Sequence, residues 1–315
     1  MKHLTLKQNF AVSHHNTLQL YKSFGVKSRK NILKQQKLTT IQKMTYHSKP
    51  KPFVKWVGGK RSIINEIVKR MPTNFNNYYE PFCGGGALFF EIYNMVKGKH
   101  FLSDMNADLV IAYNIIKNNP KELIEALKIH KENHCEEYYY KMRALQDLQN
   151  AIENSARFIY LMKTCFNGLY RVNKNNQFNV PIGSYKNPNI FDETNIYAVH
   201  EALQGVDIKY QDFSKITPQK GDFVYFDPPY QPIKPDSFTK YISGGFGEKD
   251  QERLRDFALE LKNKGVFVMI SNSNADLIFD LYDKDFKVET VPAPRVVSCK
   301  ASGRESVMET VVLGF

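Results

Sequence analysis

The stretch Phe223-Val224-Tyr225-Phe226-Asp227-Pro228-Pro229-Tyr230 decides the fold that this sequence predicts. Its first half is apolar, aromatic and β-branched, which is typical of a buried strand. Two consecutive prolines lack the N–H groups that a ladder needs, so we expect the strand to end there. The chain therefore leaves the edge of a sheet with a carboxylate, two rigid prolines and an aromatic ring in a row.

These groups fit a flat ring that carries an amino group. The Asp227 carboxylate can accept a hydrogen bond from an exocyclic amine. A carbonyl beside the prolines can accept a second one, and the Tyr230 ring offers a stacking face. Together they would draw electron density back onto the amino nitrogen. The alternative is a strand-ending turn with a buried tyrosine, which the preceding apolar strand makes the less favoured interpretation.

Composition limits the class of protein. The chain has 315 residues, enough for one large domain or two smaller ones, and its apolar fraction of 42% is enough for a core. Four cysteines without paired metal-ligand spacing predict reduced thiols in a cytoplasmic protein and no metal site. No apolar run reaches the length of about eighteen residues that a membrane span needs, so none is expected.

A basic leader occupies residues 1–48. It holds nine Lys and Arg residues and no acidic residue, so it supplies most of the net charge of +12. The total charge is therefore weak evidence for a nucleic-acid partner. The leader could be a flexible arm that attracts phosphate, or an organellar presequence, which its Lys-rich composition disfavours. We prefer the interpretation that it is disordered, dispensable or untranslated, with translation starting at Met44.

Two glycine-bearing segments precede the Asp227 motif. Residues 53–60 are Phe-Val-Lys-Trp-Val-Gly-Gly-Lys, and residues 80–87 are Glu-Pro-Phe-Cys-Gly-Gly-Gly-Ala. The second lies between a predicted strand and an apolar helix, which is the layout of a nucleoside-cofactor site. It lacks the dinucleotide fingerprint, and the first lacks the P-loop pattern. Asp104 ends a further strand, where an acid can bind ribose hydroxyls or, alternatively, cap a helix at 107–117.

A polar and aromatic segment follows a helical region at 120–160. Residues 166–183 contain two short β runs around an Asn-rich turn, which predicts a hairpin. Arg and Asn side chains can recognise guanine and adenine edges, and aromatic rings can stack on bases. An ordinary polar surface hairpin is the alternative. Further strands are expected at 206–213, 266–270, 286–291 and 308–313, a helix at 250–262, and a basic loop at 292–304.

Taken in order, these segments resemble the DNA adenine methylase family of S-adenosylmethionine-dependent N6-adenine methyltransferases. The resemblance covers roughly residues 50–315 and includes Ser-Asp-Met-Asn at 103–106. It implies an α/β fold, a Rossmann-like seven-stranded mixed methyltransferase sheet with an inserted helical and β-hairpin target-recognition domain. The catalytic domain would be discontinuous, at 49–114 and 201–315, and the insert would occupy 115–200.

The resemblance also implies roles for individual residues. The catalytic segment would be Asp227, Pro228, Pro229 and Tyr230. Contacts to the cofactor, S-adenosyl-L-methionine, would come from Trp56, Lys60, Phe82, Gly84, Asp104, Asp212, Phe213 and Asp227, with Lys60 facing the methionine carboxylate. The DNA face would carry Lys55, Phe166, Asn167, Leu169, Arg171 and Tyr185, with Arg171 recognising a base.

The implied partner is double-stranded DNA, bound by a monomer in a cytosol of the bacterial or phage type. GATC is the leading prediction for the target sequence. However, Ser184 stands before Tyr185-Lys186, where members that recognise GATC are expected to have a basic residue. Related target sequences therefore stay open. The biological role also stays open between protection beside a restriction endonuclease and strand marking.

Three other classes of function remain as alternatives. A cytosine-N4 methyltransferase would use similar chemistry, but more often with Ser in place of Asp227. An RNA or protein amide methyltransferase would share the short catalytic motif without needing the 166–183 hairpin. A DNA-binding protein without activity would keep the hairpin and could dispense with Trp56, Lys60 and Asp227.

Overall fold

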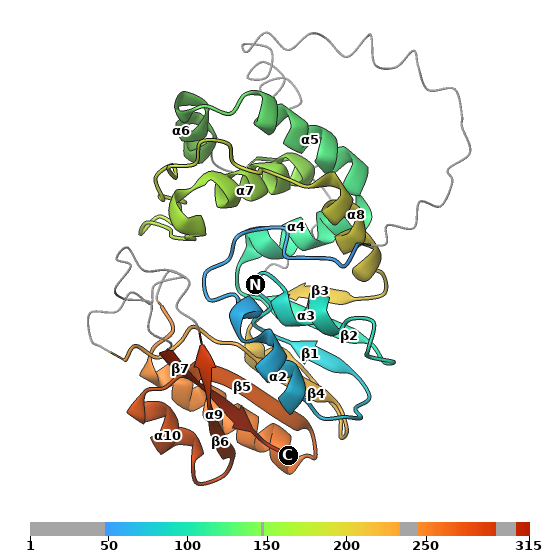
Figure 1. Ribbon diagram of the computed structural model, residues 1–315, viewed down its shortest axis with the longest axis vertical. Coiled ribbons are helices and arrows are strands. Elements are labelled where there is room, and N and C mark those ends of the chain that lie inside the picture. Colours follow the sequence, from blue (N-terminus) through green and yellow to red (C-terminus); the bar gives the residue numbers. More distant parts are fainter. Residues whose placement is uncertain (1–47, 146–147, 234–244, 294–306) are drawn as a thin grey trace, which may run out of the picture. The chain divides into compact units, whose positions relative to one another are not determined.

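The computed structural model describes residues 48–145, 148–233, 245–293 and 307–315 (Figure 1). All of them belong to one compact unit, Tyr46–Phe315. The interpretations of the basic leader and of Met44 fall outside the described residues, and so does most of the expected loop at 292–304.

A seven-stranded mixed sheet forms the centre of this unit, with the order β3-β2-β1-β4-β5-β7-β6. The strands from β3 to β5 are parallel to their neighbours, whereas β7 runs antiparallel to both β5 and β6. This arrangement confirms the predicted Rossmann-like α/β fold. The strands are β1 (Tyr78–Glu80), β2 (His100–Asp104), β3 (Asp207–Tyr210), β4 (Phe223–Phe226), β5 (Phe267–Ser273), β6 (Lys287–Ala293) and β7 (Val307–Leu313).

Strand β4 lies in the middle of the sheet and is buried on both faces. All four of its residues are at most 1% exposed, as expected of a parallel strand covered by helices on both sides. Val224 and Phe226 belong to one core with residues of α9 (Glu248–Asn263) and α10 (Asp276–Tyr282). Successive side chains point to opposite faces, so Phe223 and Tyr225 face the other side of the sheet.

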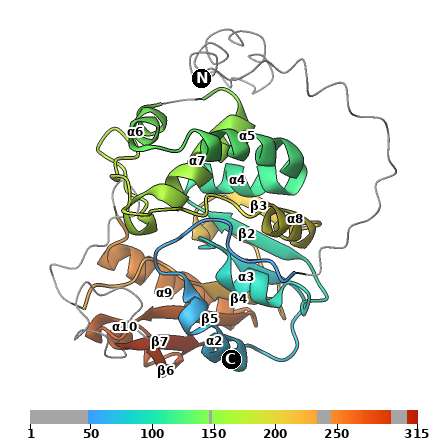
Figure 2. The same ribbon diagram turned by 45° about the horizontal axis from the view of Figure 1, so that its top comes forward.

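A group of helices occupies the middle of the sequence. α4 (Ala107–Asn118), α5 (Pro120–Glu132), α6 (Glu136–Ala144), α7 (Ala151–Thr164) and α8 (Glu193–Ala202) lie together in both views (Figures 1 and 2). The helical region expected at 120–160 is therefore confirmed. The domain boundaries at 115 and 200 stay a prediction, because α4 packs against strands β2 and β3 as well as against α5, α7 and α8.

The segment 165–185 connects back on itself, but it differs from the predicted hairpin. It contains two isolated antiparallel bridges, Cys165 with Ile182 and Val172 with Phe178, in place of two continuous strands. At the turn the Asn173 side chain accepts hydrogen bonds from the backbone N–H groups of Asn175 and Gln177, and backbone bonds join Asn173 to Gln177 and Asn179 to Arg171. Antiparallel pairing is therefore present but confined to short stretches. We call residues 165–185 the excursion.

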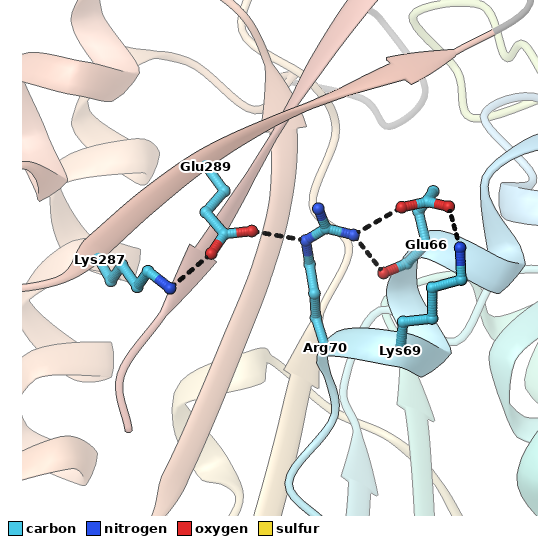
Figure 3. A network of polar contacts seen from close by, with 5 residues as sticks. All are labelled: Glu66, Lys69, Arg70, Lys287 and Glu289. Atoms are coloured by element: carbon cyan, nitrogen blue, oxygen red, sulfur yellow. Dashed lines mark hydrogen bonds and ion pairs between the residues drawn. The ribbon is translucent and has the colours of Figure 1, made fainter.

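Charged side chains join helix α2 (Ile64–Arg70) to strand β6 (Figure 3). Arg70 donates from Nε to Glu289 at 2.7 Å and from Nη1 to the Glu66 carboxylate at 2.8 Å. Lys69 pairs with Glu66 and Lys287 with Glu289. These side chains are partly exposed, so we expect the network to contribute modestly to stability.

Candidate active site

The loops that carry most of the predicted site residues meet at one edge of the sheet. Because β1 to β4 are parallel, their carboxyl ends lie at the same edge. A glycine turn follows β1, Asp104 ends β2, Asp212 follows β3 and Asp227 follows β4. The strand order changes direction between β1 and β4, and ligands of open α/β sheets bind at such a switch point.

Asp227 lies against a buried lysine. Lys60 is 5% exposed, and its Nζ lies 2.7 Å from Asp227 Oδ1. The same Nζ donates to the Gly58 carbonyl at 2.6 Å and lies 4.4 Å from the centroid of the Tyr230 ring. Despite the ion pair, Asp227 Oδ1 accepts no hydrogen bond of normal geometry from the residues described. The carboxylate thus retains a free acceptor position.

The electrostatic environment changes the acidity of this carboxyl. Burial raises the pKa of Asp227 to about 6, with Lys60 acting in the opposite direction and Glu309 in the same one. The group is therefore mainly ionised at neutral pH and can accept a hydrogen bond from an amine. It is far too weak a base to deprotonate a neutral aromatic amine. Asp227 is therefore suited to accept a hydrogen bond from the amine and not to act as a base.

The glycine turn lies against Trp56 and Asp104. Gly84 has a φ of +46°, and a Cβ at this position would lie 2.8 Å from Trp56 Cδ1, so a larger residue would not fit. Its N–H donates to Asp104 Oδ2 at 2.9 Å, and Asn106 N–H donates to Oδ1 at 2.9 Å. Burial raises the pKa of Asp104 to about 6.

The cap interpretation of Asp104 is wrong. Helix α4 is capped by Asn106, whose Oδ1 accepts from the Leu109 N–H at 2.9 Å. Asp104 ends β2 and lies two residues before Asn106, so it does not occupy the N-cap position of α4.

Phe82 and Phe213 form a stacked pair, and Asp212 directly precedes Phe213 in the chain. Phe82 stacks on Phe213 at 5.4 Å between ring centroids, and Phe213 is almost fully buried. Asp212 accepts from Arg253 of α9 at 2.8 and 3.2 Å. Burial opposes ionisation of Asp212, but the hydrogen bonds from Arg253 and Ser214 leave its pKa below the usual range.

The residues predicted for the DNA face lie on or beside the excursion. Lys55 Nζ lies 3.6 Å from the centroid of the Tyr185 ring. Phe166 and Asn167 are exposed, and Asn167 has a left-handed φ of 54°. Leu169 is half-buried and directly follows this turn. Arg171 donates to Asn179, from Nε to Oδ1 at 2.7 Å and from Nη2 to the carbonyl at 3.2 Å.

One aromatic contact links the excursion to the edge of the sheet. Trp56, which lies against Gly84, also stacks on Tyr170 at 5.8 Å between ring centroids. This ring contact places the excursion beside the glycine turn, and Lys55, predicted for the DNA face, directly precedes Trp56 in the chain.

Three further residues at this edge were not predicted. Gln251 of α9 donates to the Pro229 carbonyl, Asn272 of β5 accepts from the Gln231 N–H, and Glu309 of β7 accepts from the Tyr230 hydroxyl. Gln251 does leave a signal in the sequence, because it falls on the apolar stripe of α9 with Leu254, Ala258 and Leu261. A polar residue at such a position indicates a buried hydrogen-bond partner.

No helix within the described ranges is long and apolar enough to cross a membrane. Nor does the described part of the chain hold a group of three or more His, Cys, Asp or Glu side chains that could bind a metal ion.

Comparison with known proteins identifies the family. The family model described as D12 class N6 adenine-specific DNA methyltransferase matches residues 56–296. A type II methyltransferase of Lactococcus lactis is 44% identical over 84% of this chain and 95% of its own length. For a type II methyltransferase of Methanocaldococcus jannaschii the values are 39%, 84% and 99%, and for the DNA adenine methylase of Haemophilus influenzae they are 34%, 84% and 94%. The chain therefore belongs to the D12 class of N6 adenine-specific DNA methyltransferases.

Proposed function

We propose that this chain methylates N6 of an adenine that it has extruded from a short site in duplex DNA, with Asp227-Pro228-Pro229-Tyr230 as the catalytic segment. The observation that carries the proposal is the end of β4, where a largely buried carboxylate with a free acceptor position lies beside an aromatic ring and a lysine.

Methyltransferases of this family use S-adenosylmethionine, which supplies an electrophilic methyl group on a sulfonium. The residues at the sheet edge fit such a molecule. Asp104 offers a partly buried carboxylate for ribose hydroxyls, and Gly84 allows close approach of the backbone. Lys60 has three donors, of which two face Gly58 and Asp227, leaving one for the methionine carboxylate. Trp56, Phe82, Asp212 and Phe213 complete the proposed cofactor contacts.

The chemistry follows from the acceptors on the catalytic segment. An adenine amino group cannot be reached inside the duplex, so the base must leave the stack and lie against Tyr230. Asp227 Oδ1 and the Pro228 carbonyl accept the two amino hydrogens, with Pro229 keeping the turn rigid. The nitrogen lone pair then points away from the ring toward the methyl group. Proton loss follows transfer, because a carboxylate with a pKa of about 6 cannot remove the proton first.

Recognition of the target is assigned to the excursion and Lys55. Arg171 would recognise a base edge, and Phe166, Asn167, Leu169 and Tyr185 would complete the DNA face. GATC is the leading target sequence, and Ser184 makes a related sequence the alternative. We further propose that the enzyme acts as a cytoplasmic monomer. Its type II relatives favour a role beside a restriction endonuclease.

The test is a transfer assay with the purified chain, unmethylated DNA and S-adenosylmethionine that carries a tritiated methyl group. Chromatography of the digested DNA should show label in N6-methyladenine, and single-base mapping should place it in one short sequence. Label in N4-methylcytosine would assign the cytosine chemistry instead, and no label in DNA would contradict the proposal.

A further inference from the structure

Tyr230 is flanked on both sides by hydrogen bonds to a pair of buried amides. Gln251 Nε2 donates to the Pro229 carbonyl at 3.0 Å, and Asn272 Oδ1 accepts from the Gln231 N–H at 3.0 Å. The two amides are joined by a hydrogen bond from Asn272 Nδ2 to Gln251 Oε1 at 3.0 Å. Both are 0% exposed, so their geometry is set by the packing between α9 and β5.

The hydrogen bonds from Gln251 and Asn272 hold the segment after β4 in place of backbone bonds to a neighbouring strand. Pro228 and Pro229 have no N–H to donate, so the segment after β4 cannot continue the sheet. A third contact adds to the two amides, because Ser273 Oγ donates to the Gln231 carbonyl at 2.6 Å. Buried polar groups whose hydrogen bonds are all formed give a structure one defined geometry. The backbone on either side of Tyr230 is thus fixed by side chains from α9 and β5.

The end of the Tyr230 ring is also held. Its hydroxyl donates to Glu309 Oε2 at 2.6 Å. Glu309 lies on β7, opposite Ser273 of β5 in the antiparallel register. Lys60 Nζ lies over the ring at 4.4 Å from the centroid, so an extruded base would stack on the opposite face.

We propose that Gln251, Asn272 and Glu309 are positioning residues that hold the Tyr230 ring parallel to the extruded adenine. This inference rests on the proposed function, because it takes the ring to be the stacking surface for the base. Asp227 and the Pro228 carbonyl can accept both amino hydrogens only when the base plane is in register with them. A misplacement of about 1 Å in such an arrangement can cost about 100-fold in rate.

The experiment compares two pairs of variants. Gln251→Met keeps the volume of the side chain and removes both of its hydrogen bonds, and its control is Glu252→Ala at the exposed neighbouring position on α9. Glu309→Leu removes the acceptor for the Tyr230 hydroxyl, whereas Glu309→Gln keeps an amide oxygen that can accept. For each we measure kcat, KM for DNA, KM for S-adenosylmethionine and the melting temperature. The fluorescence of 2-aminopurine at the target position, in a duplex with the mapped site, reports stacking of the extruded base.

We expect Gln251→Met to lower kcat about 10- to 100-fold, with both KM values within about threefold of the wild type. Glu309→Leu should lower kcat about 10-fold, and Glu309→Gln should recover most of this loss, because its oxygen still fixes the ring. The 2-aminopurine should be brighter in the complexes of Gln251→Met and Glu309→Leu than in the wild-type complex, because a loosely held ring quenches it less. Glu252→Ala should match the wild type.

Wild-type kcat and wild-type fluorescence in both Gln251→Met and Glu309→Leu would overturn the inference. So would equal losses in Glu309→Leu and Glu309→Gln. If Gln251→Met does not fold, the comparison between the two Glu309 variants decides. These outcomes differ from failure of the proposed function, in which the wild type itself would transfer no methyl group to adenine.

Discussion

The end of β4 and the excursion are built in opposite ways. Asp227 and Tyr230 follow a strand whose residues are at most 1% exposed, and side chains from α9, β5 and β7 hold the backbone and the ring. In the excursion, two isolated bridges replace the strands. Within the excursion Asn179 accepts from Arg171. From outside it, Tyr139 and Arg143 of α6 donate to the Val180 carbonyl.

This difference fits the proposed assignment of the chemistry to the end of β4 and of target recognition to the excursion. Under the proposed function, a change at the end of β4 would affect the chemistry, because the catalytic segment directly follows a buried strand. A change in the excursion alters a partly exposed surface and leaves the sheet intact. Under the proposed function, target preference would therefore vary while the chemistry stays constant, and Trp56 and Tyr170 would join the two regions.

Removing the carboxylate at the end of β4 should have the largest effect. We expect Asp227→Ala to lower the single-turnover rate by about 1,000-fold, because an acceptor for the amino group is lost. Binding of DNA and of S-adenosylmethionine should change little, and equilibrium titrations check this. Asp283→Ala, at an exposed position after α10, is the control. A rate near that of the wild type would remove Asp227 from the chemistry.

The second prediction concerns Glu80, at the end of β1 beneath the site. Burial raises its pKa to about 8, against an ordinary value near 4.5. A raised pKa in the folded state adds stability below the unfolded value, and this is lost as the pH rises through the folded value. Between pH 4.5 and pH 7 the loss should be about 3 kcal/mol.

Glu80→Gln should therefore be as stable as the wild type at pH 4.5 and more stable by about 3 kcal/mol at pH 7. Urea unfolding at a series of pH values measures this. Asp104 and Asp227 also have raised pKa values, but they contribute to both proteins, so the difference between the curves isolates Glu80. Parallel curves would show that Glu80 is ionised in the folded protein.

A change in the excursion should affect preference and spare the chemistry. We expect Arg171→Ala to lose about 2 kcal/mol of discrimination at one base pair of the site. Its maximal rate on the preferred site should stay within about threefold of the wild type. Lys174→Ala, at an exposed position of the same turn, should weaken binding to all sequences alike. Unchanged base preference in Arg171→Ala would assign recognition to another residue.

The smallest effect is expected outside both regions. A double-mutant cycle of Arg70→Ala and Glu289→Ala should give a coupling energy of about 0.5 to 1 kcal/mol in unfolding experiments, since the pair is partly exposed. Activity should not change. A coupling above about 3 kcal/mol would instead place this network among the buried pairs that the fold depends on.

The sequence predicted the parts of the site that lie next to strand ends. The prolines after Phe226 and the glycines after Glu80 end their strands by local chemistry, so their positions follow from the chain itself. Gln251, Asn272 and Glu309 could not be placed in this way, because each contacts a residue 20 or more positions away along the chain. Their contacts depend on how α9 packs on the sheet and on how β5 and β7 pair within it.

The excursion was predicted less well for a related reason. Two short β runs around an Asn-rich turn indicated a hairpin, whereas the structure pairs only Cys165 with Ile182 and Val172 with Phe178; the length over which two runs pair is not encoded in the runs themselves. The partners of Lys60 were also missed. The family resemblance implied a cofactor contact for Lys60, whereas its pairing with Asp227 joins segments 167 residues apart.

The most direct test is a crystal structure of the protein with S-adenosylhomocysteine and a duplex that carries the mapped site. The account predicts an adenine outside the helix, stacked on Tyr230, with its amino nitrogen about 3 Å from both Asp227 Oδ1 and the Pro228 carbonyl. An adenine that remains paired in the duplex, or whose amino group lies away from Asp227, would contradict it.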